Sequence, residues 1–213
     1  MEQITYQNSS AENSIAKIIS YLLHPLLMPT YGFLLLFYTN NYISTFTNKE
    51  SKLVFIAIIF VFTFLLPALN ALILLKMKRI NSLEMETSKE RIIPYTSTSL
   101  YFFALFYLFY SNPFPEIFTI LILGAAISIL LTLFINFNWK ISAHATGVGG
   151  IIGAIMGISY RLNIDLQLIL FIVIALAGLV GYARLKLNAH TPAQLYTGFL
   201  LGFIVELLLM LFY

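Results

Sequence analysis

Long apolar stretches separated by short polar ones dominate the pattern of this chain. A helix needs about 20 apolar residues to cross a bilayer, and by this measure the pattern predicts seven spans. The apolar runs lack the two-residue alternation of barrel strands, which argues against a transmembrane barrel. The predicted spans are Ile15–Tyr38, Lys52–Leu75, Tyr95–Tyr110, Ile117–Phe137, Ile141–Ser159, Leu166–Tyr182 and Pro192–Tyr213.

The third span, Tyr95–Tyr110, is short and forms a hairpin with the fourth across the breaker sequence SNPFPE. The prediction is therefore an all-α, polytopic transmembrane helical bundle of six to seven spans, with residues 1–213 forming one domain. Pro25 and Pro29 should kink or break the first span. His24 lies just before this break, and we interpret it as a structural residue of a kinked helix rather than as a ligand.

The composition supports a membrane location. The 213 residues are 60% hydrophobic and only 10% charged, with a mean hydropathy of +0.88. A soluble domain of this size could not bury so much apolar surface. The N-terminal segment lacks the basic start and apolar core of a cleaved signal peptide, so the first span should stay in the protein. Cysteine is absent, which excludes disulfides and thiolate chemistry.

We expect an integral membrane protein, located in a bacterial inner membrane. Its expected partners are membrane lipids, and no nucleic acid is expected. Seven spans would place the N-terminus on one side together with the segments Lys76–Pro94, Asn138–Lys140 and Ala183–Thr191. Basic residues are more numerous on this side, which the positive-inside rule would make cytoplasmic. Some of them are also candidate ligands, so the absolute orientation stays open, as does the oligomeric state.

The fifth span begins with ISAHATGVGG, which places a histidine at the start of a glycine-rich helix. Ser142 is a good N-cap, so His144 falls in the first turn. Free backbone N–H groups at such a helix start favour anions, above all phosphate. The small residues Ala145, Gly149, Gly153 and Gly157 follow at intervals of four, and this spacing lets another helix approach closely.

The last span begins with a second motif, in the sequence ARLKLNAHTPAQLYTG. Thr191, Pro192 and Gln194 form an N-cap, a first-turn proline and the third position of a capping box. His190 lies just outside this helix start, and Arg184 lies upstream. Gly198 and Gly202 continue on one face. The two glycine-faced helices should pack together, with both histidines facing one polar cavity.

The third notable segment is KMKRINSLEMETSKERIIPY, the densest cluster of charges in the chain. Asn81 with Glu84 could cap a short interfacial helix, and the alternative is a solvated loop that rests on lipid headgroups. Lys89 and Arg91 would lie on the same side as the histidines. Two imidazoles with several cations suit phosphoryl transfer, in which one imidazole attacks phosphorus and another protonates the leaving oxygen. The histidines lack the spacing of a metal site.

Three motifs resemble those of the type 2 phosphatidic acid phosphatase family, integral-membrane lipid phosphatases related to vanadium haloperoxidases. That family has K-x6-R-P, P-S-G-H and S-R-x5-H-x3-D. The second resembles Ile141-Ser142-Ala143-His144, and the third resembles Ala183-Arg184-x5-His190-x3-Gln194. The first is matched only in composition, by Lys89, Arg91 and Pro94. The resemblance covers a phosphatase-like core at about residues 76–202.

The resemblance implies roles for these residues. His190 would be the nucleophile that forms a phosphohistidine, and His144 the general acid. Arg184, Ser142, Arg91 and Lys89 would bind phosphate. The substrate would be a lipid phosphate or pyrophosphate, and the reaction would need no metal or other cofactor.

This chain departs from the family pattern at Gln194, where the family has an aspartate that orients the nucleophile and offsets its charge. An amide can fix a tautomer but cannot neutralise charge, and the comparable change in a serine-protease triad costs roughly 10⁴ in turnover. Two alternatives therefore stand beside a lipid phosphatase. One is a non-catalytic relative that binds or moves a lipid phosphate, and the other is an unrelated transporter, for which Glu206 within the last span is the clue.

Overall fold

The protein is described by a computed structural model that covers residues 10–39 and 48–213, and every described element is helical. Within these ranges seven helices are long and apolar enough to cross a membrane, as the sequence predicts. The elements are α1 Ser10–Leu22, η1 Pro25–Leu27, α2 Met28–Tyr38, α4 Lys49–Phe60, η2 Val61–Leu65, α5 Leu66–Lys76, α6 Ser88–Tyr110, α7 Glu116–Asn136, α8 Ala143–Leu162, α9 Gln167–Lys186 and α10 Pro192–Phe212.

The first span is broken where the two prolines predict. His24 has an extended backbone, and its Nδ1 accepts a hydrogen bond of 3.3 Å from Leu26 N–H. The 3₁₀ turn η1 then leads into α2, which carries Pro29 in its first turn. A proline lacks the N–H that an interior helical position needs, so the chain restarts its helix here.

The third span differs from the prediction, because α6 begins at Ser88 and contains Pro94. Thr87 and Glu90 form a capping box, so the first turn of the helix includes the charged residues Lys89, Glu90 and Arg91. The predicted short helix capped by Asn81 is wrong. Asn81 instead donates from its backbone N–H to Glu90 Oε1 at 3.2 Å, which joins the irregular 77–87 segment to the start of α6.

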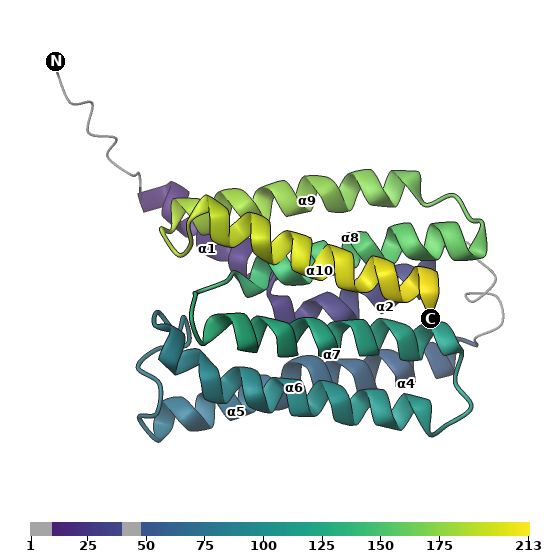
Figure 1. The fold of residues 1–213 in the computed structure, drawn as a ribbon, viewed down its shortest axis with the longest axis horizontal. Coiled ribbons are helices and arrows are strands. Elements are labelled where there is room, and N and C mark those ends of the chain that lie inside the picture. Colours follow the sequence, from purple (N-terminus) through teal and green to yellow (C-terminus); the bar gives the residue numbers. More distant parts are fainter. Residues whose placement is uncertain (1–9, 40–47) are drawn as a thin grey trace, which may run out of the picture.

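The connections alternate between the two ends of the bundle (Figure 1). The segments 77–87, 137–142 and 187–191 lie at one end, together with the start of α1. We call this the histidine end, because it carries the starts of α8 and α10. The segments 111–115 and 163–166 and the C-terminus lie at the opposite end.

Helices α8 and α10 pack along their whole length through the predicted glycine faces. A Cβ at Gly149 would collide with the carbonyl oxygen of Phe199, and one at Gly153 with that of Phe203. From the other side, a Cβ at Gly202 would collide with the carbonyl oxygen of Thr146. The two backbones are thus in direct contact, as small residues at this spacing permit.

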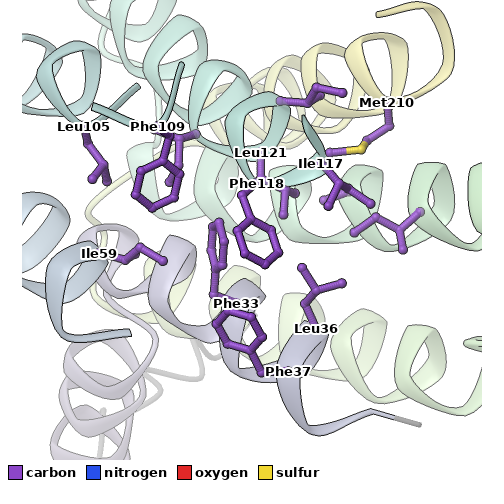
Figure 2. Close-up of a cluster of buried hydrophobic side chains, with 14 residues drawn as sticks. Phe33, Leu36, Phe37, Ile59, Leu105, Phe109, Ile117, Phe118, Leu121 and Met210 are labelled. Carbon is purple, nitrogen blue, oxygen red and sulfur yellow. The ribbon is translucent and has the colours of Figure 1, made fainter. Parts of the chain in front are cut away.

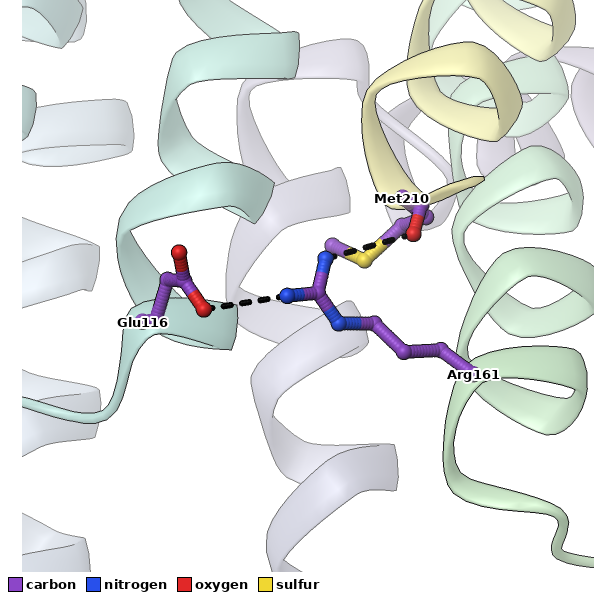
Figure 3. Close-up of polar contacts among 3 residues, drawn as sticks. All are labelled: Glu116, Arg161 and Met210. Carbon is purple, nitrogen blue, oxygen red and sulfur yellow. Dashed lines mark hydrogen bonds and ion pairs between the residues drawn. The ribbon is translucent and has the colours of Figure 1, made fainter. Parts of the chain in front are cut away.

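The opposite end is filled by an aromatic and aliphatic core, in which Phe33, Phe109 and Phe118 are fully buried (Figure 2). Arg161 closes the same end (Figure 3). Its Nη2 donates to Glu116 Oε2 at 3.0 Å and its Nη1 to the Met210 carbonyl at 3.4 Å, so one side chain joins α7, α8 and α10.

Candidate functional site

A cavity of about 210 Å³ lies between the helices below the histidine end. His144 and His190 both line it, as the sequence predicts. Arg91 and Arg184 line it as well, and so does His24. The cavity therefore gathers imidazoles and cations from four parts of the chain that are far apart in sequence.

His190 is held between two helix ends. Asn188, in a left-handed conformation with φ 50°, follows the end of α9. The Ala189 N–H returns to the Arg184 carbonyl at 3.1 Å, as in a Schellman motif. Immediately after His190, Thr191 caps α10, and its hydroxyl accepts from Gln194 N–H at 3.4 Å. The ring position is thus set by backbone geometry on both sides.

Gln194 determines which ring nitrogen of His190 carries the proton. Its Oε1 accepts from the Thr191 backbone N–H at 3.1 Å, which identifies that atom as the amide oxygen. The same oxygen lies 3.1 Å from His190 Nδ1, so Nδ1 must be the donor. Nε2 is then the unprotonated nitrogen with a free lone pair.

His190 is neutral over a wide pH range. It is only 7% exposed, and this burial, reinforced by the Arg91 guanidinium, lowers the pKa of its imidazole to about 3. The hydrogen bond with Gln194 opposes this shift. A neutral imidazole with an unprotonated Nε2 is the form that a nucleophile requires.

His144 stands in the first turn of α8, behind the Ser142 cap, whose hydroxyl accepts from Ala145 N–H at 3.4 Å. Its Nε2 lies 3.1 Å from the carbonyl oxygen of Ser20, so Nε2 carries a proton and donates it. The His24 ring lies edge-on to the His144 ring, with 5.4 Å between the centroids. His144 is therefore bound to α1 in this arrangement.

His24 is a site residue that sequence reasoning assigned to structure alone. Its Nδ1 accepts from Leu26 N–H, so the proton of its neutral ring is on Nε2. His24 therefore caps the turn at the proline break and also lines the cavity. The sequence signal was weak, because a histidine before a proline has a sufficient structural explanation.

Arg91 joins two segments of the histidine end. It is only 4% exposed, and its Nε donates to the Met85 carbonyl at 2.8 Å while Nη1 donates to the Ile141 carbonyl at 3.3 Å. The 77–87 segment and the start of the α8 motif are thus held by one guanidinium.

Arg184, in the last turn of α9, donates from Nη1 to the Ser20 hydroxyl at 3.2 Å. Its Nε is buried and has no hydrogen-bond partner among the described residues. Lys140, which precedes the α8 motif, is a third cation nearby. Burial lowers the pKa of its ammonium, and the charges of Arg91 and Arg184 lower it further.

These three cations form no close ion pair with a described residue. The two ion pairs within the described ranges are Arg161–Glu116 and Lys186–Glu12, and neither involves Arg91, Arg184 or Lys140. Buried charges in proteins are normally paired. Arg91 and Arg184 line the cavity without such a partner, so they are suited to bind an anion there.

Two predicted ligands lie elsewhere. Ser142 is fully buried and uses its hydroxyl as the α8 cap, and Lys89 is exposed on the first turn of α6. Neither lines the cavity. Gln194 also lies outside the lining, and it reaches the cavity only through His190.

No set of three or more histidine and acidic side chains in the described part of the chain is arranged to hold a metal ion. Comparison of this chain with family models, curated proteins and solved structures finds no match.

Proposed function

We propose that this protein is a membrane phosphatase that hydrolyses a lipid phosphate or pyrophosphate through a phosphohistidine on His190. One observation carries the proposal. A neutral, buried imidazole has its Nδ1 proton held by Gln194, which leaves Nε2 free. The ring lines a cavity with two arginines that form no ion pair with any described residue. The motifs that resemble the type 2 phosphatidic acid phosphatases support the same assignment.

In the first step, His190 Nε2 forms a bond to phosphorus as the bond to the lipid oxygen breaks, and that oxygen takes up a proton. In the second step, water attacks the phosphohistidine, the P–N bond breaks and inorganic phosphate leaves. Arg91 and Arg184 hold the phosphoryl oxygens and stabilise the charge that these oxygens carry in both transition states.

The proton for the leaving oxygen has two possible donors in the cavity. His144 is the donor that the motif resemblance implies, and its Nε2–H must leave the Ser20 carbonyl to act. His24 carries its proton on Nε2 and lies beside His144. A p-nitrophenyl phosphate needs little protonation of its leaving group, whereas an alkyl phosphate needs it strongly. His144→Ala and His24→Ala can be compared with both substrates. The general acid is the histidine whose replacement abolishes only the hydrolysis of the alkyl phosphate.

The direct test uses purified protein in detergent with a chelator present. Wild type should release phosphate from lysophosphatidate, and His190→Ala should abolish this release while its thermal unfolding stays unchanged. Lys89→Ala is the control and should release phosphate as wild type does. This exposed cation lies on the same helix turn as Arg91 but outside the cavity. Turnover that survives His190→Ala contradicts the mechanism.

A second candidate, a non-catalytic lipid-phosphate binding protein, is favoured by one observation. The partner of His190 is an amide, which cannot offset the positive charge that develops on the ring. In that case wild type would release no phosphate. Arg184→Ala would weaken binding of lysophosphatidate most, because it removes a planar set of donors that grips phosphate oxygens.

A further inference from the structure

Glu206 is a carboxyl group buried deep in the same cavity, and the proposed mechanism does not use it. It lies on α10, lines the cavity and is only 5% exposed. Its Oε2 has no hydrogen-bond partner among the described residues. Leaving such a group unpaired is costly, and a carboxyl within a membrane span is usually functional.

The surroundings of Glu206 make room for the carboxyl. A Cβ at Gly124, on α7, would lie 2.5 Å from Glu206 Cδ, so only glycine leaves the space that this carboxyl occupies. Ser128 follows one turn nearer the histidine end, where it lines the same cavity. Its hydroxyl also has no partner in the part of the chain that the structure describes. Two hydrogen-bonding groups therefore face the deep part of the cavity.

The cavity joins these groups to the cationic end. The cavity lining is mainly apolar and includes Phe102, Ile129, Ile151 and Ile155. A phosphate headgroup at Arg184 would thus direct an attached apolar chain towards Glu206.

The depth of Glu206 can be derived from helix geometry. Gly124 lies 12 residues before Asn136, the last residue of α7 at the histidine end, which corresponds to about 18 Å at 1.5 Å per residue. An extended chain advances about 1.2 Å per bond. A group about 15 bonds from phosphorus would therefore reach the carboxyl.

We infer that the cavity takes a lipid phosphate whose apolar chain carries a hydroxyl group about 15 bonds from phosphorus, and that Glu206 binds this hydroxyl. The inference rests on the proposed function, because it assumes a phosphate at the cationic end. A glutamate oxygen accepts from the hydroxyl, and Ser128 supplies a second contact. An unsubstituted chain would instead cover both polar groups and leave them unpaired.

The test compares the binding of three lipids that share one headgroup, and it uses the full chain with His190→Ala to prevent turnover. The probes are 10-hydroxyoctadecanoyl, 3-hydroxyoctadecanoyl and octadecanoyl lysophosphatidate, with affinities from native mass spectrometry. The 10-hydroxy lipid should bind roughly tenfold or more tightly than the other two, because only its hydroxyl reaches Glu206. The 3-hydroxy lipid controls for polarity near the headgroup.

Variants assign the effect to the carboxyl. Glu206→Met should remove the preference by strengthening binding of the unsubstituted lipid, and Glu206→Gln should keep most of it. Glu84→Gln, at a carboxylate near the cavity mouth, should leave it unchanged.

The possible failures are distinguishable. Equal binding of the 10-hydroxy and unsubstituted lipids overturns this inference and leaves the proposed function standing. A preference that persists in Glu206→Met overturns the assignment to Glu206. Failure of all three lipids to bind overturns the proposed function together with the inference.

Discussion

At His190 one amide oxygen decides which ring nitrogen is free. Gln194 Oε1 is held in place by a backbone N–H, so its identity as an acceptor follows from the helix start itself. The imidazole is then neutral because it is buried beside Arg91. The position of the ring proton therefore depends on Gln194, whereas the neutral charge depends on burial beside Arg91. A substitution at Gln194 can test the two effects independently.

Gln194→Glu tests these causes. Glutamate keeps both the length of the side chain and the capping box, while it places a negative charge beside His190. We expect the pKa of His190 to rise from about 3, because an opposite charge favours the imidazolium. NMR titration of ¹⁵N-labelled histidine, assigned with His190→Ala, measures the change. If His190 already titrates near pH 6.5 in wild type, the description of a buried neutral ring is wrong.

The lowered pKa also has a consequence for stability. An unfolded chain takes up a proton at this histidine near pH 6.5, whereas the folded site does so only near pH 3. The unfolded state therefore binds more protons between these values, and His190 destabilises the fold as pH falls from about 6.5 towards 3. Gln194→Glu should raise the pKa of His190 in the folded state, and so narrow the pH range over which His190 destabilises the fold.

Sequence reasoning recognised the site residues that stand at helix starts. The motifs around His144 and His190 contain caps, and caps fix position within a few residues. Ser20 contributes a carbonyl and a hydroxyl to the site, and nothing local in its sequence indicates this. Such contacts depend on which helices meet, and only the folded chain determines that.

At the scale of helices, the α8–α10 contact is the tightest feature of the fold. Gly202→Ala should lower the melting temperature, because the added methyl group would collide with the Thr146 backbone, which cannot move as a flexible side chain does. Overpacking of this kind typically costs about 1–3 kcal/mol. Circular dichroism in detergent is a suitable measurement.

The matched control is Gly178→Ala on α9, where a Cβ would meet nothing within 4 Å. Alanine favours a helix over glycine by roughly 0.5–1 kcal/mol, so this variant should be neutral or slightly stabilising within the chain. A similar loss of stability in both variants would show that the close α8–α10 contact is not the cause.

The helices were predicted from apolar runs, and their ends were predicted best where caps are unambiguous. Thr191 and Ser142 cap α10 and α8 as expected. The start of α6 was missed because its first residues are charged and contain a proline, although Thr87 and Glu90 carry the cap signal. An average of hydropathy over a window excludes these charged residues from the span, and it contains no information about the cap.

The whole molecule has one polar end and one apolar end. The cations and histidines gather around the cavity at the histidine end, while phenylalanines and the Arg161 side chain fill the opposite end. Phe33, Leu121 and Ile158 belong to the core at this opposite end and also line the cavity, so a ligand that enters from the histidine end would meet apolar side chains there.

This arrangement predicts the side from which each connection is accessible. The chain has no cysteine, so single cysteines can be introduced cleanly. Ser82→Cys and Asn188→Cys should react with an impermeant maleimide from one side of the membrane, and Asn112→Cys and Asp165→Cys from the other. Labelling of Ser82→Cys and Asn112→Cys from the same side would contradict the seven-span count.

The lack of space between α8 and α10 also bears on how this sequence can change over generations. Any glycine codon becomes an alanine codon through one base substitution, so Gly149, Gly153 and Gly202 are always a single mutation away from a steric collision. Selection should remove such mutations at these three positions. At Gly178 and Gly181, where the surroundings are open, the same mutation can persist, so drift among descendants of this gene should be confined to the glycines outside the contact.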